Sequence, residues 1–385
     1  MALTHSCVWY EWEFAKKFYA TYSPGVRWAA LTDLDSVGRG RCLANVAVLY
    51  ATKYRHTLAA ADKTEANALI DDVNAQYALW CTQWASPLVA YPLILAAWLM
   101  DQVASDDKVG DIATNMTTEL DYWEAYNGGD PETGYIDDSK AESNGWTACL
   151  LYLGGCVWSD AGWKAQGKNW GYFTLSYSDD SYGGTTGIQT IYENGAGDAD
   201  FLDNACCHPN PAYAYNSIGF LARCQLAEWL VLNNTAILSE FSHRVDDVWR
   251  AHWDYVNSTT WKWHTNWTDT DCDTNDCRSE HGQDKWGNDM RCMNDAFVYK
   301  FIYSGQTSYD DVLEYEASFF DGNYTVYIEY NDGYDYNNDT KFLLDAVFMF
   351  RHLVAYWVGL QNAPRLYCRE GSNMWYFKPD GIGLS

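Results

Sequence analysis

The segment Asp137–Trp146 holds residues that could do chemistry on a sugar, since it crowds acids, a lysine and an amide directly before an apolar run. Residues three or four positions apart share one face of a helix, so Asp137, Lys140 and Asn144 would lie on the same face. That face becomes apolar further along, at Ala148. The pattern predicts a buried helix whose polar start faces a cleft.

A second candidate is His208, which precedes a predicted helix that carries Tyr213 and Tyr215. Pro209 and Pro211 suit the start of a helix, where a missing N–H costs little. The positive end of the helix dipole disfavours imidazolium, and neutral imidazole is the form that a general base needs. A capping or packed histidine is the competing interpretation.

The third candidate is the loop from Arg278 to Arg291, which also contains His281 and Trp286. In a chain with few cations, this cluster could hold an anionic substrate, because Arg pairs with a carboxylate through two hydrogen bonds. The indole of Trp286 could stack on a sugar ring. A solvated loop with a buried salt bridge is the alternative.

Paired acids support a rival mechanism. Asp137–Asp138 and Asp179–Asp180 could supply the acid and base of an inverting glycosidase, whose carboxyl groups lie ~6.5–9.5 Å apart. Adjacent acids are common in a chain this acidic, so this pattern is weakly specific.

A calcium loop is a lesser possibility at residues 269–280. Its acids follow the ligand spacing of an EF-hand, but a threonine occupies the position that needs glycine. We therefore expect no cofactor and no metal, with calcium at this loop as the minor alternative. The residues at the ligand positions are Asp269, Asp271, Asp273, Asn275 and Glu280.

The composition indicates a globular protein that acts on a glycan. The chain has 385 residues, 48% of them hydrophobic, with 20 Trp and 30 Tyr, an excess that would suit a sugar-binding groove. Its net charge of −27 argues against nucleic acid and against an anionic membrane surface as partners. No apolar run reaches the ~18 residues of a membrane span, so we expect a soluble monomer with a polysaccharide substrate.

Twelve cysteines indicate an oxidising compartment. Cys272 and Cys277 flank a short loop and are expected to pair, whereas the adjacent Cys206 and Cys207 are expected to reach different partners. The N-terminal residues lack the basic and apolar regions of a signal peptide, so we interpret the chain as a mature, secreted glycoprotein. Six N-glycosylation sequons agree with this: Asn115, Asn233, Asn257, Asn266, Asn323 and Asn338.

Helical periodicity recurs along the chain with short breaks, and amphipathic segments alternate with nearly apolar ones. This succession predicts an all-α fold, one α/α toroid of six or seven helical hairpins, as a single domain over residues 1–385. Long loops at 176–211 and 257–288 would cover one mouth of the toroid, and residues 324–330 could form a short β-hairpin. The expected helices are 7–21, 40–58, 63–83, 87–104, 108–125, 138–155, 160–170, 212–232, 236–256, 290–303, 307–320 and 340–359.

Three segments resemble a known family. Asp138-Ser139-Lys140-Ala141-Glu142-Ser143-Asn144-Gly145-Trp146 is similar to the Asp-Thr-Lys-Ala-Glu-Glu-Asn-Ala-Trp type of segment in α/α-toroid polysaccharide lyases, most of all polysaccharide lyase family 38. Residues 203–213 resemble that group's Asn-His…His-Pro…Tyr region, and residues 283–286 its Gln-Asp-Trp segment. Ala205 replaces the first expected histidine, and Lys285 interrupts the Asp-Trp pair.

The resemblance implies β-elimination from a 1,4-linked uronan, alginate or glucuronan. Asn144, with Arg278 or Arg291, would neutralise the C6 carboxylate, and His208 would remove the C5 proton. Tyr213 or Tyr215 would protonate the departing O4, with His281 in reserve for either proton transfer. Further substrate contacts are expected from Lys140, Glu142, Trp146, Asp284 and Trp286. The alternative is an inverting hydrolase of a neutral glycan such as mannan.

Overall fold

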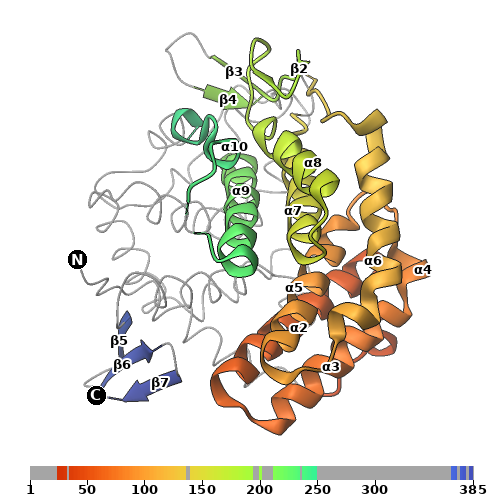
Figure 1. The fold of residues 1–385 in the computed structure, drawn as a ribbon, viewed down its shortest axis with the longest axis vertical. Coiled ribbons are helices and arrows are strands. Elements are labelled where there is room, and N and C mark those ends of the chain that lie inside the picture. The colour runs from red at the N-terminus through yellow and green to blue at the C-terminus, as the bar shows by residue number, and fades with distance from the viewer. Residues whose placement is uncertain are drawn as a thin grey trace, which may run out of the picture. The chain divides into compact units, whose positions relative to one another are not determined.

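The computed structural model describes residues 24–32, 34–135, 139–193, 199–201, 211–234, 236–248, 366–370, 373–378 and 381–384. Over these ranges the chain is mostly helical, and its strands are short (Figure 1). Contacts divide the chain into two compact units. The first comprises Met1–Tyr122, Thr307–Tyr324 and Asp335–Ser385, and the second comprises Trp123–Gln306 and Thr325–Tyr334.

The first unit contains the helices η1 (Trp28–Ala30), α2 (Ser36–Thr57), α3 (Ala60–Ala75), α4 (Tyr77–Trp80), α5 (Pro87–Ala104) and most of α6 (Lys108–Ala125). It also contains an antiparallel sheet in the order β5 (Leu366–Glu370), β6 (Asn373–Lys378), β7 (Gly381–Leu384). Helix α2 packs on α3 and α5 to form the core of this unit.

Helix α5 is the most apolar of the helices described in the first unit. Its residues from Val89 to Ala97 are buried, because both α2 and α3 cover it. Among the described residues it alone is long and apolar enough to cross a membrane, yet 67% of it is buried inside the protein, as in a core helix. Asp35 starts the partner helix α2 by accepting a hydrogen bond from the Gly38 N–H at 2.6 Å.

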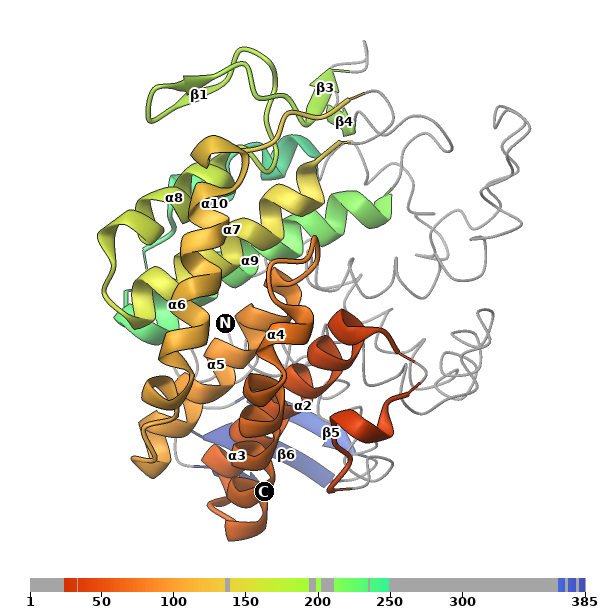
Figure 2. The same ribbon diagram turned by 90° about the vertical axis from the view of Figure 1, so that its right-hand side faces the viewer.

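The second unit contains η2 (Tyr126–Gly129), α7 (Ala141–Val157), α8 (Ala161–Tyr172), α9 (Pro211–Leu232) and α10 (Ser239–Ser242). Two antiparallel hairpins, β1 (Ser181–Tyr182) with β2 (Thr185–Thr186) and β3 (Ile191–Glu193) with β4 (Ala199–Phe201), lie between α8 and α9 in the sequence. Helices α7, α8 and α9 lie side by side (Figures 1 and 2).

Helix α7 is the centre of the second unit, because α8 and α9 cover it from two sides and bury it from Ser143 to Cys156. Two glycines let α7 and α8 approach closely. A Cβ at Gly167 would lie 2.6 Å from the Tyr152 backbone nitrogen, and one at Gly155 would lie 2.6 Å from the Lys164 nitrogen. Any larger residue would therefore push the two helices apart.

The bounds of several expected helices agree with those observed. The ranges 87–104 and 108–125 match α5 and α6, and 212–232 differs from α9 by one residue at its start. The range 63–83 is interrupted, since α3 ends at Ala75 and α4 follows. The range 236–256 contains the short α10 and four further helical residues at 245–248 before the described residues end.

The mainly helical class is confirmed, whereas the sheet β5–β6–β7 and the hairpins of the 176–211 loop were not expected. The helices expected at 7–21, 290–303, 307–320 and 340–359 and the hairpin at 324–330 lie outside the described residues. Five cysteines of the described helices and loops are free, without a disulfide: Cys42, Cys81, Cys149, Cys156 and Cys224. The predicted pairings of Cys206, Cys207, Cys272 and Cys277 also lie outside the described ranges.

Candidate functional site

Asn144 lies in the first turn of α7 and is fully buried. Its side-chain oxygen accepts from the Glu132 N–H at 3.0 Å, and its Nδ2 donates to the Glu132 carbonyl at 2.9 Å and the Phe173 carbonyl at 3.2 Å. These contacts use both amide hydrogens, so Asn144 has none left for a substrate carboxylate in this arrangement. It joins α7 to the segment before it and to the end of α8.

The other sequence candidates at the start of α7 are only partly exposed. Trp146 is 2% exposed and packs against the Phe220 ring, whereas Lys140 and Glu142 are half-buried. Tyr213 and Tyr215 belong to the first turns of α9, and their side chains lie outside the described structure. So do Asp137, Asp138, His208, Arg278, His281, Asp284, Trp286, Arg291 and the loop 269–280.

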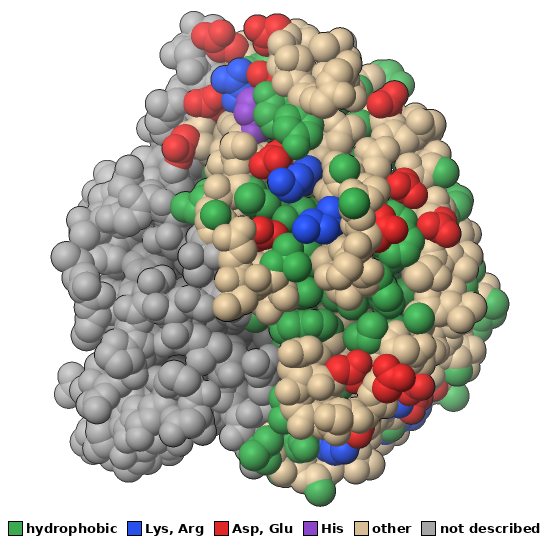
Figure 3. Space-filling model, viewed as in Figure 1, with side chains coloured by type: hydrophobic (Ala, Val, Ile, Leu, Met, Phe, Trp, Pro, Cys, Tyr) green, Lys and Arg blue, Asp and Glu red, His purple; other side chains and the backbone are tan. Residues whose placement is uncertain are grey.

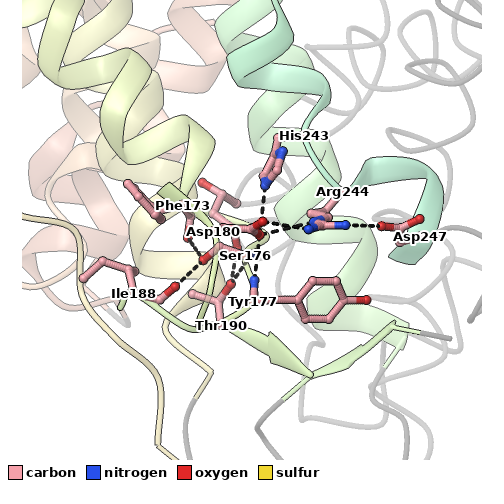
Figure 4. A network of polar contacts seen from close by, with 10 residues as sticks. Phe173, Ser176, Tyr177, Asp180, Ile188, Thr190, His243, Arg244 and Asp247 are labelled. Atoms are coloured by element: carbon pink, nitrogen blue, oxygen red, sulfur yellow. Dashed lines mark hydrogen bonds and ion pairs between the residues drawn. The ribbon is translucent and has the colours of Figure 1, made fainter. Parts of the chain in front are cut away.

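A polar cluster centres on Asp180, in the loop after α8 (Figure 4). The Asp180 carboxylate accepts from Arg244 at 2.7 and 3.2 Å and from the Tyr177 backbone N–H at 2.8 Å. His243 Nε2 lies 3.0 Å from its Oδ2 atom. Burial alone raises the pKa of Asp180, but the hydrogen bonds from Arg244, His243 and Tyr177 outweigh it and hold the pKa below 3.8. Asp180 is therefore a stable anion.

The ionised Asp180 fixes the tautomer of His243. A carboxylate only accepts hydrogen bonds, so Nε2 of His243 carries the ring proton and Nδ1 keeps its lone pair. Burial lowers the pKa of His243 below 6.5 by more than Asp180 raises it, so the ring is neutral at neutral pH. Nδ1 has no hydrogen-bond partner among the described residues, and 17% of the side chain is exposed.

Two tyrosines extend this histidine into a stack of rings. The Tyr172 ring lies 3.8 Å from the His243 ring, centre to centre, and 4.9 Å from the Tyr182 ring, and it is close to parallel to both. No ring contact joins Tyr182 to His243, so Tyr172 lies between them. Burial raises the pKa of Tyr172 above its usual 10.0. Its hydroxyl forms no hydrogen bond within the described ranges and keeps its proton at neutral pH.

A second ion pair borders the stack. Glu240 Oε1 accepts from the Tyr182 hydroxyl at 2.9 Å and lies 3.1 Å from Lys168 Nζ. Burial raises the pKa of Tyr182 to about 12, with Glu240 adding to the shift. Charged side chains, a histidine and hydrophobic groups also gather on the face shown in Figure 3. The cluster thus combines a neutral base, protonated tyrosines and two basic side chains.

The sequence positions the cluster through α9 and the loop after α8. Gln225 of α9 is fully buried, donates to the Ala236 carbonyl at 2.7 Å and accepts from the Leu238 N–H at 2.9 Å, which fixes the approach to α10. On the other side, Ser176 and Thr190 hold the loop, since the Ser176 N–H donates to Thr190 Oγ1 at 2.9 Å. Asp180 and His243 therefore meet because two buried clamps hold their segments.

Arg244 follows His243 in a left-handed backbone conformation, with φ of 56°. This conformation disfavours residues other than glycine and is common at functional sites. Three side-chain interactions of Arg244 offset the cost of this conformation. They are the pair of hydrogen bonds to Asp180, a 3.2 Å hydrogen bond to Asp247, and a cation–π contact with the Tyr177 ring at 4.5 Å from its centre. They leave two of its five N–H hydrogens for another acceptor.

In the part of the chain that the structure describes, no three acids, histidines or cysteines are grouped to hold a metal ion. Comparison of the chain with models of known families, with characterised proteins and with solved structures gives no match.

Sequence reasoning selected Asp180 but assigned it to a carboxylate pair, and it missed His243, Arg244 and Tyr172. The contacts of His243 and Arg244 with Asp180 span 63 and 64 residues of sequence, and Tyr172 joins the cluster through the His243 ring, so no local pattern indicates them. Asp179, the other member of the predicted acid pair, is exposed and takes no part in the cluster.

Proposed function

We propose that the protein is a polysaccharide lyase that cleaves a 1,4-linked uronan, alginate or glucuronan, by β-elimination. The observation that carries this proposal is the neutral His243, oriented by an ionised Asp180 and stacked on a protonated tyrosine. β-Elimination needs a base for the C5 proton, an acid for O4 and a cation near the C6 carboxylate. The cluster contains a candidate for each role.

His243 is the base of the proposed reaction. Its Nδ1 lone pair takes the C5 proton, and the C4–O4 bond breaks as the C4–C5 double bond forms. Asp180 stabilises the imidazolium that results, because it accepts from Nε2 at 3.0 Å. The positive charge thus forms beside a carboxylate that holds it.

Tyr172 protonates the departing O4 in this proposal. Its ring contacts His243, its hydroxyl has no partner within the described ranges, and its raised pKa keeps the proton in place until O4 develops negative charge. Arg244 donates its remaining hydrogens to the C6 carboxylate, which makes the C5 proton more acidic. Lys168 is a second cation near the stacked rings, because it pairs with Glu240, which accepts a hydrogen bond from the Tyr182 hydroxyl.

The hydrolase alternative has less support from the same cluster. An inverting glycosidase needs one carboxyl group with a raised pKa as its acid. The pKa values of Asp180 and Glu240 are both lowered, because hydrogen bonds and neighbouring cations outweigh their burial. Neither carboxyl group would hold a proton at neutral pH.

A substrate panel tests the proposal. The protein is incubated with alginate, glucuronan and mannan, while ultraviolet absorbance and reducing ends are both followed. We expect absorbance from a uronan, because elimination leaves an unsaturated product. New reducing ends from mannan, with no absorbance from any uronan, would overturn the lyase assignment in favour of a hydrolase.

Single substitutions then test the roles. His243→Ala should lower the rate on the uronan by about 10²–10⁴-fold, the contribution of a general base. Asp179→Asn, next to the cluster but exposed, should leave the rate unchanged. The family resemblance assigns the base to His208 instead, so full activity in His243→Ala with none in His208→Ala would move that role to His208.

The proposal extends to the setting of the enzyme. The helical hairpins would continue into an α/α toroid of six or seven pairs forming one catalytic domain over residues 1–385, and the protein would be a secreted monomer without a cofactor. Support comes from the succession of packed neighbours α7, α8 and α9 and from the sequons in the sequence. Light scattering of the secreted protein checks the monomer, and a crystal structure checks the toroid.

A further inference from the structure

Two of the six glycosylation sequons begin at described residues, one within a helix and one directly after a helix, and their surroundings differ. The first, Asn115-Met116-Thr117, is in the middle of α6, and the second begins at Asn233, directly after α9. N-linked glycans occur on exposed segments, because the sugar must stay in water. The two sites can therefore be compared by exposure, backbone conformation and hydrogen bonding.

The Asn115 side chain is already engaged between two helices. Its Nδ2 donates to the Asn74 side-chain oxygen at 2.8 Å and to the Asn74 carbonyl at 3.2 Å, which connects α6 to α3. Met116 is fully buried, and the Thr117 hydroxyl donates back to the Ala113 carbonyl at 2.8 Å. A sugar on Asn115 would replace one of the Nδ2 hydrogens and would have to fit between α3 and α6.

Asn233 has the opposite surroundings. It is exposed, and its backbone is left-handed with φ of 52°, a conformation that asparagine tolerates better than most residues. Its side chain forms no hydrogen bond with any described residue. The turn is held instead by Asn234, whose Nδ2 donates to Glu228 at 2.5 Å and whose Oδ1 accepts from the Ala236 N–H at 3.2 Å. A modification at Asn233 therefore breaks no hydrogen bond of the turn.

We propose that the secreted protein carries an N-linked glycan on Asn233 and none on Asn115. The donor is a lipid-linked oligosaccharide diphosphate. A bond forms between Asn233 Nδ2 and C1 of the first sugar, the bond from C1 to the diphosphate oxygen breaks, and Nδ2 loses one proton. The glycan would then project from the end of α9. This assignment is independent of the β-elimination chemistry, since it needs only transit through a glycosylating pathway.

The experiment maps glycan occupancy in the full chain, secreted from a eukaryotic host behind the host's own signal peptide. N-glycans are released enzymatically in ¹⁸O water, which converts each occupied asparagine into labelled aspartate for mass spectrometry. We expect label at Asn233 and none at Asn115. An unlabelled Asn233 would overturn the proposal, whether or not other sequons are occupied, and a labelled Asn115 would overturn its second half.

Matched variants check the assignment by gel mobility before and after glycan release. Thr235→Ala should remove one glycan from the secreted protein, whereas Thr235→Ser should retain it, because serine still completes the sequon. Thr117→Val abolishes the other sequon but leaves the contact between Asn74 and Asn115 in place. It should cause no shift in mobility, and a shift would show that Asn115 is occupied.

Discussion

The hydrogen bonds of the Asp180 carboxylate can be tested by measuring the free energy of unfolding, without any substrate. It accepts four hydrogen bonds, from two Arg244 nitrogens, the Tyr177 N–H and His243, and its side chain is 7% exposed. Asp180→Asn keeps one acceptor oxygen but turns an NH₂ group toward these donors. Oδ1 accepts one of the four bonds and Oδ2 accepts the other three, so an asparagine that keeps its oxygen at the Oδ2 position loses the bond from Arg244 Nη2. A bond to a charged group is worth about 1.5–3 kcal/mol, so unfolding should become easier by about that amount.

The matched control is Asp179→Asn, which removes the same charge from an exposed neighbour. It should change the free energy of unfolding by less than about 0.5 kcal/mol. Urea unfolding, followed by tryptophan fluorescence, compares both variants with the parent chain. If Asp180→Asn and Asp179→Asn unfold with free energies within about 0.5 kcal/mol of each other, the hydrogen bonds of Asp180 do not stabilise the folded protein by the predicted amount.

The pH dependence of the difference in unfolding free energy between the parent chain and Asp180→Asn provides a second test. The pKa of Asp180 is lowered from 3.8 in the folded protein, so the folded state favours the carboxylate. Its stabilising contribution is therefore complete well above pH 3.8, and it is lost as the pH falls through the lower folded value. This difference in unfolding free energy should be constant at neutral pH and should decrease only below pH 3.8.

Three further predictions follow from neighbouring features. Because burial holds the pKa of His243 below 6.5, the acidic limb of the rate on a uronan should have its midpoint below pH 6.5, and a midpoint above that value would exclude His243 as the base. Gly167→Ala should destabilise the protein by about 1–3 kcal/mol in a denaturant titration, since its Cβ would lie 2.6 Å from the Tyr152 nitrogen; the gain usual for alanine in a helix would contradict this. Gln225→Ala should speed hydrogen exchange at Leu238 and the residues that follow, and unchanged exchange there would show that the clamp is dispensable.

The helices could be predicted where the sequence showed both a helical periodicity of apolar residues and a residue that marks the start or end of a helix. Helix α5 begins at Pro87, which suits the first turn of a helix, and its apolar residues continue to Ala104. The range 63–83 was predicted as one helix because its periodicity continues across Gln76, where the observed backbone leaves the helical region. Such a break depends on packing, since the Trp80 indole donates to the Val73 carbonyl across it at 3.0 Å.

The candidate site was far less predictable. Asn144 attracted attention as an amide on a polar helix face, but its hydrogen bonds are to backbone groups of Glu132 and Phe173, the latter 29 positions away. Sequence spacing shows which residues share a helix face, but not which distant loop will cover that face. His243 gave no local signal for the same reason, because the carboxylate of Asp180 gives it an orientation only in the folded chain.

The wide separation of Asp180 and His243 has a consequence for protein synthesis. Asp180 is translated 63 residues before His243. During that interval the Asp180 carboxylate has no histidine ring to orient. The Tyr152 hydroxyl meets Glu228 of α9 across 76 residues, and that helix is complete before His243 is translated. Helices α7 and α9 can thus dock while the chain is still growing, whereas the Asp180–His243 pair forms only after α10 has emerged. A nascent chain that stops at the end of α9 would hold the framework of the second unit without its proposed base.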